Sequence, residues 1–321
     1  GDVYKRQISW MIQGVLWISR QSYGMLTIGH VPFLWVFLFY FMIGLWIWKK
    51  NGQNRHIRIS LAYVIMIILI WIPMARRKSL AFLDVGQGDC FVADTKSGAV
   101  IFDGGSSSED QVGRYRILPY MKYLGYQKIQ IAVISHMDID HYSGIKELLE
   151  MGKIKYLGLP EIPKDETMKK IIGIAKKRGT TIFYLSRGRQ IATKDGSLKV
   201  LHPQKNSQME KNAASLVMQG KILGYQVLLT GDVEKEGEEE LLSEELERAD
   251  ILKAAHHGSK NSTSNEFLQK VQPKQTVISC GKQNRYGHPH LETIHRLQTY
   301  RTKIYRTDRS GAIIFFKRRD G

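Results

Sequence analysis

The sequence predicts an α/β domain over residues 79–321, preceded in residues 1–78 by a membrane segment with two transmembrane helices. Three observations lead to this division. Long uncharged apolar runs occupy the first part, short β-rich runs alternate with helical patterns in the second part, and polar residues follow several of the predicted strands. A chain of 321 residues has room for two such units.

Two uncharged apolar runs lie in the first part. Val31–Trp48 has 18 residues and Ile59–Ala75 has 17, each about long enough to cross a hydrocarbon core of roughly 30 Å. Neither run has a polar face, which favours membrane helices over helices buried in a soluble core. The chain does not begin with Met, and we expect it to be a fragment.

Lysine and arginine residues predict the orientation in the membrane. Residues 21–30 contain neither, whereas the connection between the two runs carries Lys49, Lys50, Arg55 and Arg58. Positive charge favours the cytoplasmic side, so we expect a multi-pass protein of the cell membrane whose residues after 78 lie outside the cytoplasm. The Arg-Arg-Lys sequence at residues 76–78 favours the opposite orientation, with the following residues in the cytoplasm.

The chain is basic, with a formal net charge of +17, of which residues 1–80 carry +9 and the remainder +8. Such an excess is compatible with a phosphate-rich partner and also with an ordinary solvated surface. Cys90 and Cys280 lie on predicted strands without the spacing of a zinc-binding motif. We expect two buried thiols, with a disulfide as the alternative outside the cytoplasm.

The elements of the second part are predicted in a regular order. LAFLDV (80–85), CFVADT (90–95) and AVIFDGG (99–105) are short strands separated by turn residues, and a helix follows around residues 113–124. IQIAVISH (129–136) is a buried strand that ends at a histidine, and LKVLHP (198–203), SLVMQGKILGYQVLLTGD (215–232) and DILKAAHH (250–257) are further strands that end in Asp or His. Acidic residues after 232 open a helix. In α/β sheets ligands bind beyond the strand ends.

Ligand-type side chains gather at three of these strand ends. The segment SHMDIDHYSG (135–144) holds four of them: His136, Asp138, Asp140 and His141. A loop that follows a strand can turn all four toward one point, and carboxylate and imidazole suit a divalent ion that keeps coordination positions open for water. Asp232 ends a second strand, and His256 and His257 end a third. Three such clusters predict a metal site.

These residues closely resemble the metallo-β-lactamase superfamily, and within it the C-terminal domain of the ComEC/Rec2 family of DNA-uptake competence proteins. The resemblance rests on LDVGQGDC, FDGG, SHMDIDHYSG, LLTGD, HHGS, YGHPH and RTDRSGAI, which occur in this order over most of residues 80–317. It implies a metallo-β-lactamase-like αββα sandwich for residues 79–321. It also places the two apolar runs at the C-terminal end of that family's membrane channel region.

The resemblance implies a set of metal ligands. Asp140, His141 and His257 would hold one ion, Asp232 would bridge two ions, and His136 with Asp138 would hold the other. The sequence departs from the superfamily pattern at two places: Asp138 stands where a second histidine is usual, as in the uptake family, and Lys211, Asn212 and Ala213 stand where a third is usual. We therefore expect one or two divalent ions, Zn²⁺ or Mn²⁺, with the His136 site the weaker one and more favourable to Mn²⁺.

Other residues are expected around these ligands. Asp140, Asp232 and His256 are the candidate catalytic residues. Five further residues could orient the ligands or contact the substrate: Asp89, Asp103, His202, Asn212 and His288. His202 could instead replace the missing third histidine ligand. More simply, Asp89 and Asp103 could be turn residues that cap strands, and His202 could be a surface histidine.

Hydrolysis is the expected reaction, because the sequence contains no Ser/His/Asp or Cys/His nucleophile signature and a divalent ion can activate water. The resemblance implies a metal-dependent deoxyribonuclease that degrades one strand of incoming DNA during natural transformation, with DNA, the lipid bilayer and other competence proteins as partners. Two alternatives stay open: a catalytically weak structural module of a DNA transporter, and a metallo-hydrolase of another phosphodiester. Lys253, Lys260, Lys282 and Arg285 could steer phosphates or belong to a solvated surface.

Overall fold

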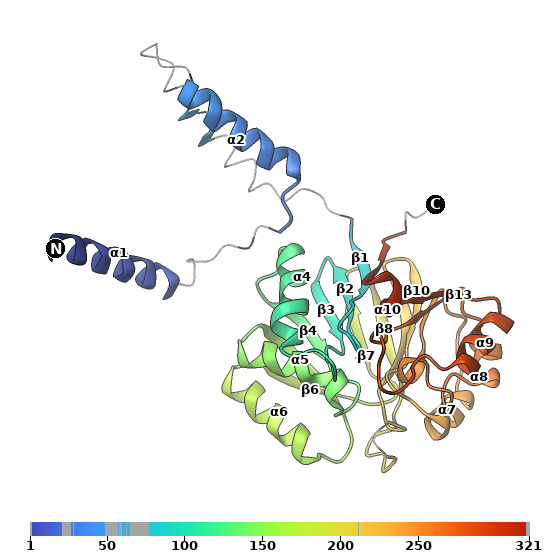
Figure 1. Cartoon of the computed structure of the whole chain (residues 1–321). Coiled ribbons are helices and arrows are strands. Elements are labelled where there is room, and N and C mark those ends of the chain that lie inside the picture. The colour runs from blue at the N-terminus through green and yellow to red at the C-terminus, as the bar shows by residue number, and fades with distance from the viewer. Residues whose placement is uncertain are drawn as a thin grey trace. The chain divides into compact units, whose positions relative to one another are not determined.

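The computed structural model of the chain is shown in Figure 1. It describes residues 2–20, 27, 29–48, 57, 60–61, 63–64, 77–210 and 212–318. The chain separates into two compact units, Gly1–Ala75 with Lys122–Gln127, and Arg76–Met121 with Lys128–Gly321. The assignment of a membrane segment to residues 1–78 and a hydrolase to residues 79–321 stays a prediction.

The first unit contains the helices α1 (Asp2–Arg20) and α2 (Phe33–Trp48). Helix α2 lies inside the first predicted apolar run, has no charged residue and follows directly after Pro32, a residue favoured at helix starts. Among the described residues, no helix is both long enough and apolar enough to span a bilayer. Most of the second run, Ile59–Ala75, lies outside the described residues. The two transmembrane helices therefore stay predictions.

The second unit is built on two mixed β-sheets. In the described part of the chain, each sheet has seven strands, in the orders β14-β1-β2-β3-β4-β5-β6 and β13-β12-β11-β10-β9-β8-β7. Strands β3 to β6 run parallel in the first sheet and β10 to β13 run parallel in the second, and the remaining pairs are antiparallel. The strands of the first sheet are β1 (Ser79–Phe82), β2 (Phe91–Thr95), β3 (Gly98–Phe102), β4 (Ile129–Val133), β5 (Ile154–Pro160), β6 (Thr181–Leu185) and β14 (Ile313–Phe316). Those of the second are β7 (Gln190–Thr193), β8 (Gly196–His202), β9 (Val217–Ile222), β10 (Tyr225–Leu229), β11 (Ile251–Lys253), β12 (Gln275–Ile278) and β13 (Lys303–Arg306).

Helices cover the outer faces of the two sheets (Figure 1), with α5 and α6 on one side and α7, α8 and α9 on the other. This confirms the predicted α/β sandwich of two sheets between two helical layers. Besides α1 and α2, the helical segments of the described residues are η1 (Gly113–Ile117, a π-helical turn), α4 (Leu118–Tyr123), α5 (Ile139–Glu150), α6 (Glu166–Lys177), α7 (Lys235–Leu242), η2 (Ala255–Gly258, a 3₁₀ turn), α8 (Asn265–Val271), α9 (Leu291–Thr299) and α10 (Thr307–Ser310).

The main core lies between the sheets. Phe82 and Phe102 from the first sheet pack in one cluster with Met218 and Val277 from the second, and all four are at most 5% exposed. Burying each such side chain contributes about 1.5–3 kcal/mol relative to leaving it in water. Cys90 and Cys280 are buried free thiols, as the sequence predicted.

Several predicted strands end earlier than their apolar pattern. The run 129–136 is a strand only as far as Val133, and the run 250–257 only as far as Lys253. The run 215–232 is a hairpin of β9 and β10. In each case the residues after the strand leave the ladder, so that their side chains turn toward the edge of the sheet and not onto its faces.

Candidate metal centre

The polar clusters predicted from the sequence meet at one edge of the sandwich. Strands β3 and β4 run parallel, as do β10 and β11, so the carboxyl ends of each pair lie together. Asp103 and His136 follow the first pair, and Asp232 and His257 follow the second. Because the two sheets pack face to face, residues from both sheets converge on one point, as is usual for ligand sites in α/β folds.

Two imidazoles and two carboxylates of this group lie close together. Nε2 of His141 lies 3.2 Å from Oδ2 of Asp232. Nε2 of His257 lies 3.4 Å from the same oxygen and 3.4 Å from Oδ2 of Asp140. Both imidazoles are at most 1% exposed, and the carboxylate side chains are 4% and 16% exposed. Four predicted ligands thus face one another in a site that is closed on most sides.

The opposite ring nitrogen of each imidazole is already engaged. Nδ1 of His141 donates to Oδ2 of Asp103 at 2.9 Å, and Nδ1 of His257 donates to the carbonyl oxygen of Ser279 at 2.9 Å. Carboxylate and carbonyl oxygens only accept, so a neutral ring carries its proton on Nδ1 and presents a lone pair at Nε2. Within the described residues, both Nε2 atoms are buried and make no hydrogen bond. Metal-binding histidines have this arrangement.

A second pair of ligand-type side chains lies beside the first group. The His136 ring centroid is 4.2 Å from that of His141, and its Nε2 lies 3.5 Å from Oδ2 of Asp138. His136 is buried, whereas the side chain of Asp138, at the start of α5, is 38% exposed. One fixed imidazole and one half-exposed carboxylate offer a divalent ion fewer rigid donors than the first group does.

The two adjacent histidines of HHGS point in different directions because their backbone is unusual. His256 and His257 have φ values of 47° and 53°, in the left-handed region that non-glycine residues seldom adopt. His257 enters the buried group, while His256 is 23% exposed, with Nδ1 2.9 Å from Oε1 of Glu234 and Nε2 3.8 Å from Oδ2 of Asp232. Backbone strain of this kind is concentrated at functional sites.

A glycine lets the FDGG loop approach the first turn of α5 closely. The amide of Gly104 donates to the carbonyl of His141 at 2.8 Å. A Cβ atom on Gly105 would lie 2.5 Å from the carbonyl carbon of Asp140 and 2.5 Å from the amide nitrogen of His141, which is closer than carbon atoms can pack. Gly105 is therefore required for α5 to deliver these two residues to the centre.

Asp89 and Lys253 lie behind the imidazoles. Oδ1 of Asp89 is 3.6 Å from Nδ1 of His257, and Oδ2 is 3.7 Å from Nδ1 of His141, so this carboxylate approaches the rings on their Nδ1 side. The Asp89 carboxylate still belongs to a set with His141, Asp232 and His257 whose donor atoms lie within 4.8 Å of one another. Lys253 forms an ion pair with Asp89 and is 4% exposed. The expectation that this lysine is solvated or steers phosphates was wrong.

The charges of this group shift its pKa values in a consistent way. Burial disfavours a charged ring, but Asp232 and Asp103 outweigh it and raise the pKa of His141 well above its ordinary value. Burial is likewise outweighed at His257, where Asp232 and Asp89 raise the pKa. At Asp232, burial would raise the pKa, yet the charges of His141, His257 and Lys253 hold it well below the ordinary value. A divalent ion that binds here must therefore displace protons from the imidazoles.

An open cleft of about 470 Å³ lies above the centre. Asp140, Asp232 and His257 contribute to its lining together with Gln87 and Tyr286. Oε1 of Gln87 accepts a hydrogen bond from the amide of Gly281 at 3.1 Å, and its buried Nε2 has no partner among the described residues. The cleft thus offers a spare amide donor close to the carboxylates and imidazoles.

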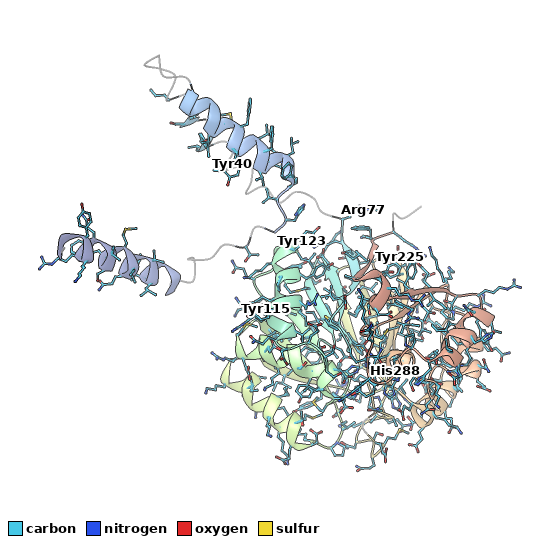
Figure 2. All side chains as sticks on the ribbon, viewed as in Figure 1. Tyr40, Arg77, Tyr115, Tyr123, Tyr225 and His288 are labelled. Carbon is cyan, nitrogen blue, oxygen red and sulfur yellow. The ribbon has the colours of Figure 1, made fainter. Side chains whose placement is uncertain are left out.

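The remaining predicted residues lie in different places. His288, labelled in Figure 2, lines the cleft, and burial together with the charges of His257, His256 and His290 lowers its pKa to about 4. His202 is buried elsewhere, with Nε2 2.7 Å from the carbonyl of Ala213 and Nδ1 3.1 Å from Glu240. Neither His202 nor Asn212 contributes to the lining of the cleft. The structure thus does not bring His202 to the position of a replacement ligand.

Sequence reasoning missed several residues of this region. Gln87, Tyr142, Thr167 and Tyr286 line the cleft but belong to no ligand class, so only tertiary packing reveals them. The sequence around Lys253 does indicate that this lysine is buried and paired. It is a lysine inside the apolar run ILKAA of a strand that pairs with parallel strands on both sides, where a buried charge requires a partner.

The donor set suits a divalent metal ion. It combines buried imidazoles whose Nδ1 atoms are held by acceptors, Nε2 atoms that make no hydrogen bond in the described part of the chain, and ionised carboxylates. Carboxylates and imidazoles are typical ligands of Zn²⁺ and Mn²⁺. His141, His257, Asp140 and Asp232 would hold one ion, with Asp232 placed to bridge to a second position near His136 and Asp138. These assignments of individual ligands stay predictions.

The metallo-β-lactamase superfamily model matches residues 83–282. The fold also matches that of the metallo-β-lactamase fold protein YhfI from Bacillus subtilis, with a TM-score of 0.51 and 12% identity over 74% of this chain and 99% of that one. At this identity, the likeness concerns the fold alone.

Three curated relatives carry the names of competence or recombination proteins. ComE operon protein 3 of Bacillus subtilis (strain 168) is 33% identical over 98% of this chain and 43% of its own length. Competence protein ComA of Neisseria gonorrhoeae is 30% identical over 74% of this chain and 32% of its own. Recombination protein 2 of Haemophilus influenzae is 27% identical over 82% and 32%. These relatives are ComEC family members, which confirms the resemblance seen in the motifs, and the chain spans less than half of their length.

Proposed function

The chain belongs to the metallo-β-lactamase superfamily, and from that premise we propose that residues 79–321 are a metal-dependent hydrolase that cleaves DNA phosphodiester bonds. One observation carries the proposal: two buried imidazoles, one from α5 and one from η2, turn Nε2 atoms that make no hydrogen bond within the described residues toward the same carboxylate at the base of an open cleft. A structural polar cluster would be expected to satisfy these atoms internally.

A divalent ion bound here would supply Lewis acidity and an activated water molecule. The side chains of the chain do the rest. Asp103 and the carbonyl of Ser279 hold the imidazoles in the correct tautomer and orientation. Asp140 and Asp232 place ionised carboxylates at the floor of the cleft, where a phosphodiester would be positioned for attack.

Two further groups are placed to act on the substrate. Nε2 of His256 faces Asp232 at the edge of the cleft and can give a proton to the departing oxygen, while Oε1 of Glu234 lies 2.9 Å from its Nδ1. The spare Nε2–H of Gln87 can donate to a non-bridging phosphate oxygen. Lys282 and Arg285 are exposed on the loop that carries Tyr286 and His288 into the cleft, and they would attract a polyanion.

The relatives favour DNA over other phosphodiesters, because they are named as competence and recombination proteins. In this proposal, the domain degrades one strand of incoming DNA beside a membrane channel, with the other strand and other competence proteins as partners. The apolar runs 31–48 and 59–75 would anchor the chain in the cell membrane with the hydrolase outside the cytoplasm. Alkaline phosphatase fused after Ser79 should then be active in cells, and an inactive fusion beside a fluorescent cytoplasmic reporter would contradict this orientation.

The hydrolysis is tested with the whole chain in detergent, incubated with single-stranded and duplex DNA in Mn²⁺, Zn²⁺ or chelator. Cleavage should require metal and should be lost in Asp232→Ala, while Asp110→Ala, which removes an exposed carboxylate, should behave like the unaltered chain. Circular dichroism checks the fold of each variant. Undiminished cleavage in folded Asp232→Ala would overturn the role of this carboxylate. Metal binding without cleavage of any DNA would favour a metal-stabilised module of a transporter.

A further inference from the structure

Lys253 is a buried cation beside the candidate metal centre. Its strand, β11, lies between β10 and β12, and the side chain is 5% exposed. The ammonium has three neighbours: it pairs with Asp89, donates to the carbonyl oxygen of Gly231 at 2.9 Å, and lies 3.5 Å from Oδ1 of Asp232. A lysine this deeply buried is rare unless its charge is paired.

The position of the ammonium relative to Asp232 is the informative feature. Oδ1 of this carboxylate faces Lys253, whereas Oδ2 faces Nε2 of His141 at 3.2 Å and Nε2 of His257 at 3.4 Å. One carboxylate group therefore lies between a permanent cation of the protein and the place where a metal ion would bind. Any divalent ion held by Oδ2 would lie within a few ångströms of a like charge, in surroundings that screen charge poorly.

Asp89 completes the arrangement. Its carboxylate approaches His141 and His257 on their Nδ1 side and shares the ammonium with Asp232. Without Lys253, two buried carboxylates would have only imidazoles as counter-charges whenever the centre holds no ion, and buried charges without partners are strongly destabilising.

We propose that Lys253 is an internal counter-ion that stabilises the metal-free centre and lowers its affinity for divalent cations. The inference rests on the proposed metal centre, and it adds a reason why that centre would bind metal reversibly and not permanently. Lys253 acts through Asp89 and Asp232, so it is a positioning residue that need not touch the substrate.

The test is a double-mutant cycle on metal affinity in the whole chain. Mn²⁺ binding is measured by calorimetry for the unaltered chain, Lys253→Met, Asp89→Asn and the double variant, together with the melting temperature of each chelator-treated protein. Lys253→Met should bind Mn²⁺ about tenfold or more tightly and should melt at a lower temperature without metal. Asp89→Asn should bind more weakly, and the double variant should return toward the unaltered affinity because the two charge changes cancel. Lys177→Met, at an exposed position on α6, is the matched control and should change neither quantity.

A lysine with only a packing role would weaken metal binding when replaced, or leave it unchanged, and either result for Lys253→Met would overturn the inference. If Lys253→Met does not fold, the double variant, which leaves neither member of the ion pair unpaired, is compared with Asp89→Asn. It must bind Mn²⁺ more tightly than that single variant, and equal or weaker binding would overturn the inference. Absence of Mn²⁺ binding by the unaltered chain would contradict the proposed metal centre itself. That result is distinguishable from a failure of the role proposed for Lys253, in which the unaltered chain binds Mn²⁺.

Discussion

Replacing Asp103 by asparagine tests whether the orientation of His141 controls the metal centre. Asp103 is fully buried, and its two oxygens have separate tasks: Oδ1 accepts from the amide of Ser135 at 2.7 Å, and Oδ2 accepts from Nδ1 of His141 at 2.9 Å. Its φ of 58° lies in the left-handed region, which asparagine tolerates well. The substitution keeps shape and backbone, replaces one acceptor by a donor and removes one buried negative charge.

The consequence follows from hydrogen-bond geometry. If the side-chain oxygen of the introduced asparagine keeps the bond to the amide of Ser135, its NH₂ group must face Nδ1 of His141. Nδ1 then becomes the acceptor, the proton moves to Nε2, and the lone pair that faces Asp232 is lost. Loss of such an orienting partner costs about 10- to 100-fold in metal affinity, or about 1.4–2.7 kcal/mol.

The assay is calorimetric titration of chelator-treated protein with Mn²⁺ or Zn²⁺, with circular dichroism to establish folding and exposed Asp110→Asn as the control. Asp103→Asn should fold, and its metal affinity should fall by at least about tenfold. A folded variant with unaltered metal affinity would refute the argument that Asp103 sets the tautomer of His141.

Three other predictions follow from the structure. His202→Ala should lower the free energy of unfolding by about 1–3 kcal/mol, because the carbonyl of Ala213 loses its partner. The same variant should reduce the rate of DNA hydrolysis by at most about 10- to 100-fold. A larger loss of rate in a folded variant would place this histidine in the site after all. Elemental analysis of the unchelated chain should find one ion firmly bound and a second that appears only after addition of Mn²⁺ or Zn²⁺. The second ion binds more weakly because His136 and half-exposed Asp138 form the looser group. Absence of any stoichiometric metal would contradict the metal centre. Burial would raise the pKa of Asp250, but Lys274, the amide of Gln226 and Arg318 lower it overall. The ionised Asp250 side chain should therefore stabilise the fold above the unfolded-state pKa of about 3.9. This contribution should disappear as the pH falls through the lower folded-state pKa. Asp250→Asn should therefore be less stable than the unaltered chain at pH 7, and thermal unfolding should show that difference shrinking below about pH 4; a difference independent of pH would contradict the shift.

The sequence predicted the location of the centre because local rules determine it. A buried apolar run predicts a strand, and the polar residues directly after it must leave the sheet at its edge, as Asp103, His136 and Asp232 do. The family resemblance that these motifs carry then implied the sandwich. Strand ends were less accurate, since the apolar pattern continues past Val133 and Lys253 while the hydrogen-bond ladder stops there.

What could not be predicted depends on contacts between residues far apart in the chain. Whether Asp89 approaches an imidazole from the Nε2 or the Nδ1 side is decided by the packing of one sheet against the other. His202 looked like a strand-end ligand, but Glu240 of α7 and the carbonyl of Ala213 engage both ring nitrogens. The burial of Lys253 depends on partners more than twenty residues away.

We expect the Nε2 atoms of His141 and His257 to converge on a metal ion held with Asp140 and Asp232. Anomalous diffraction from crystals of the chain soaked in Mn²⁺ would locate such an ion. A peak is expected at the floor of the cleft, about 2.0–2.3 Å from these two nitrogens and from a carboxylate oxygen of Asp232. No peak in the cleft, or a peak on the Nδ1 side of the rings beside Asp89, would contradict it.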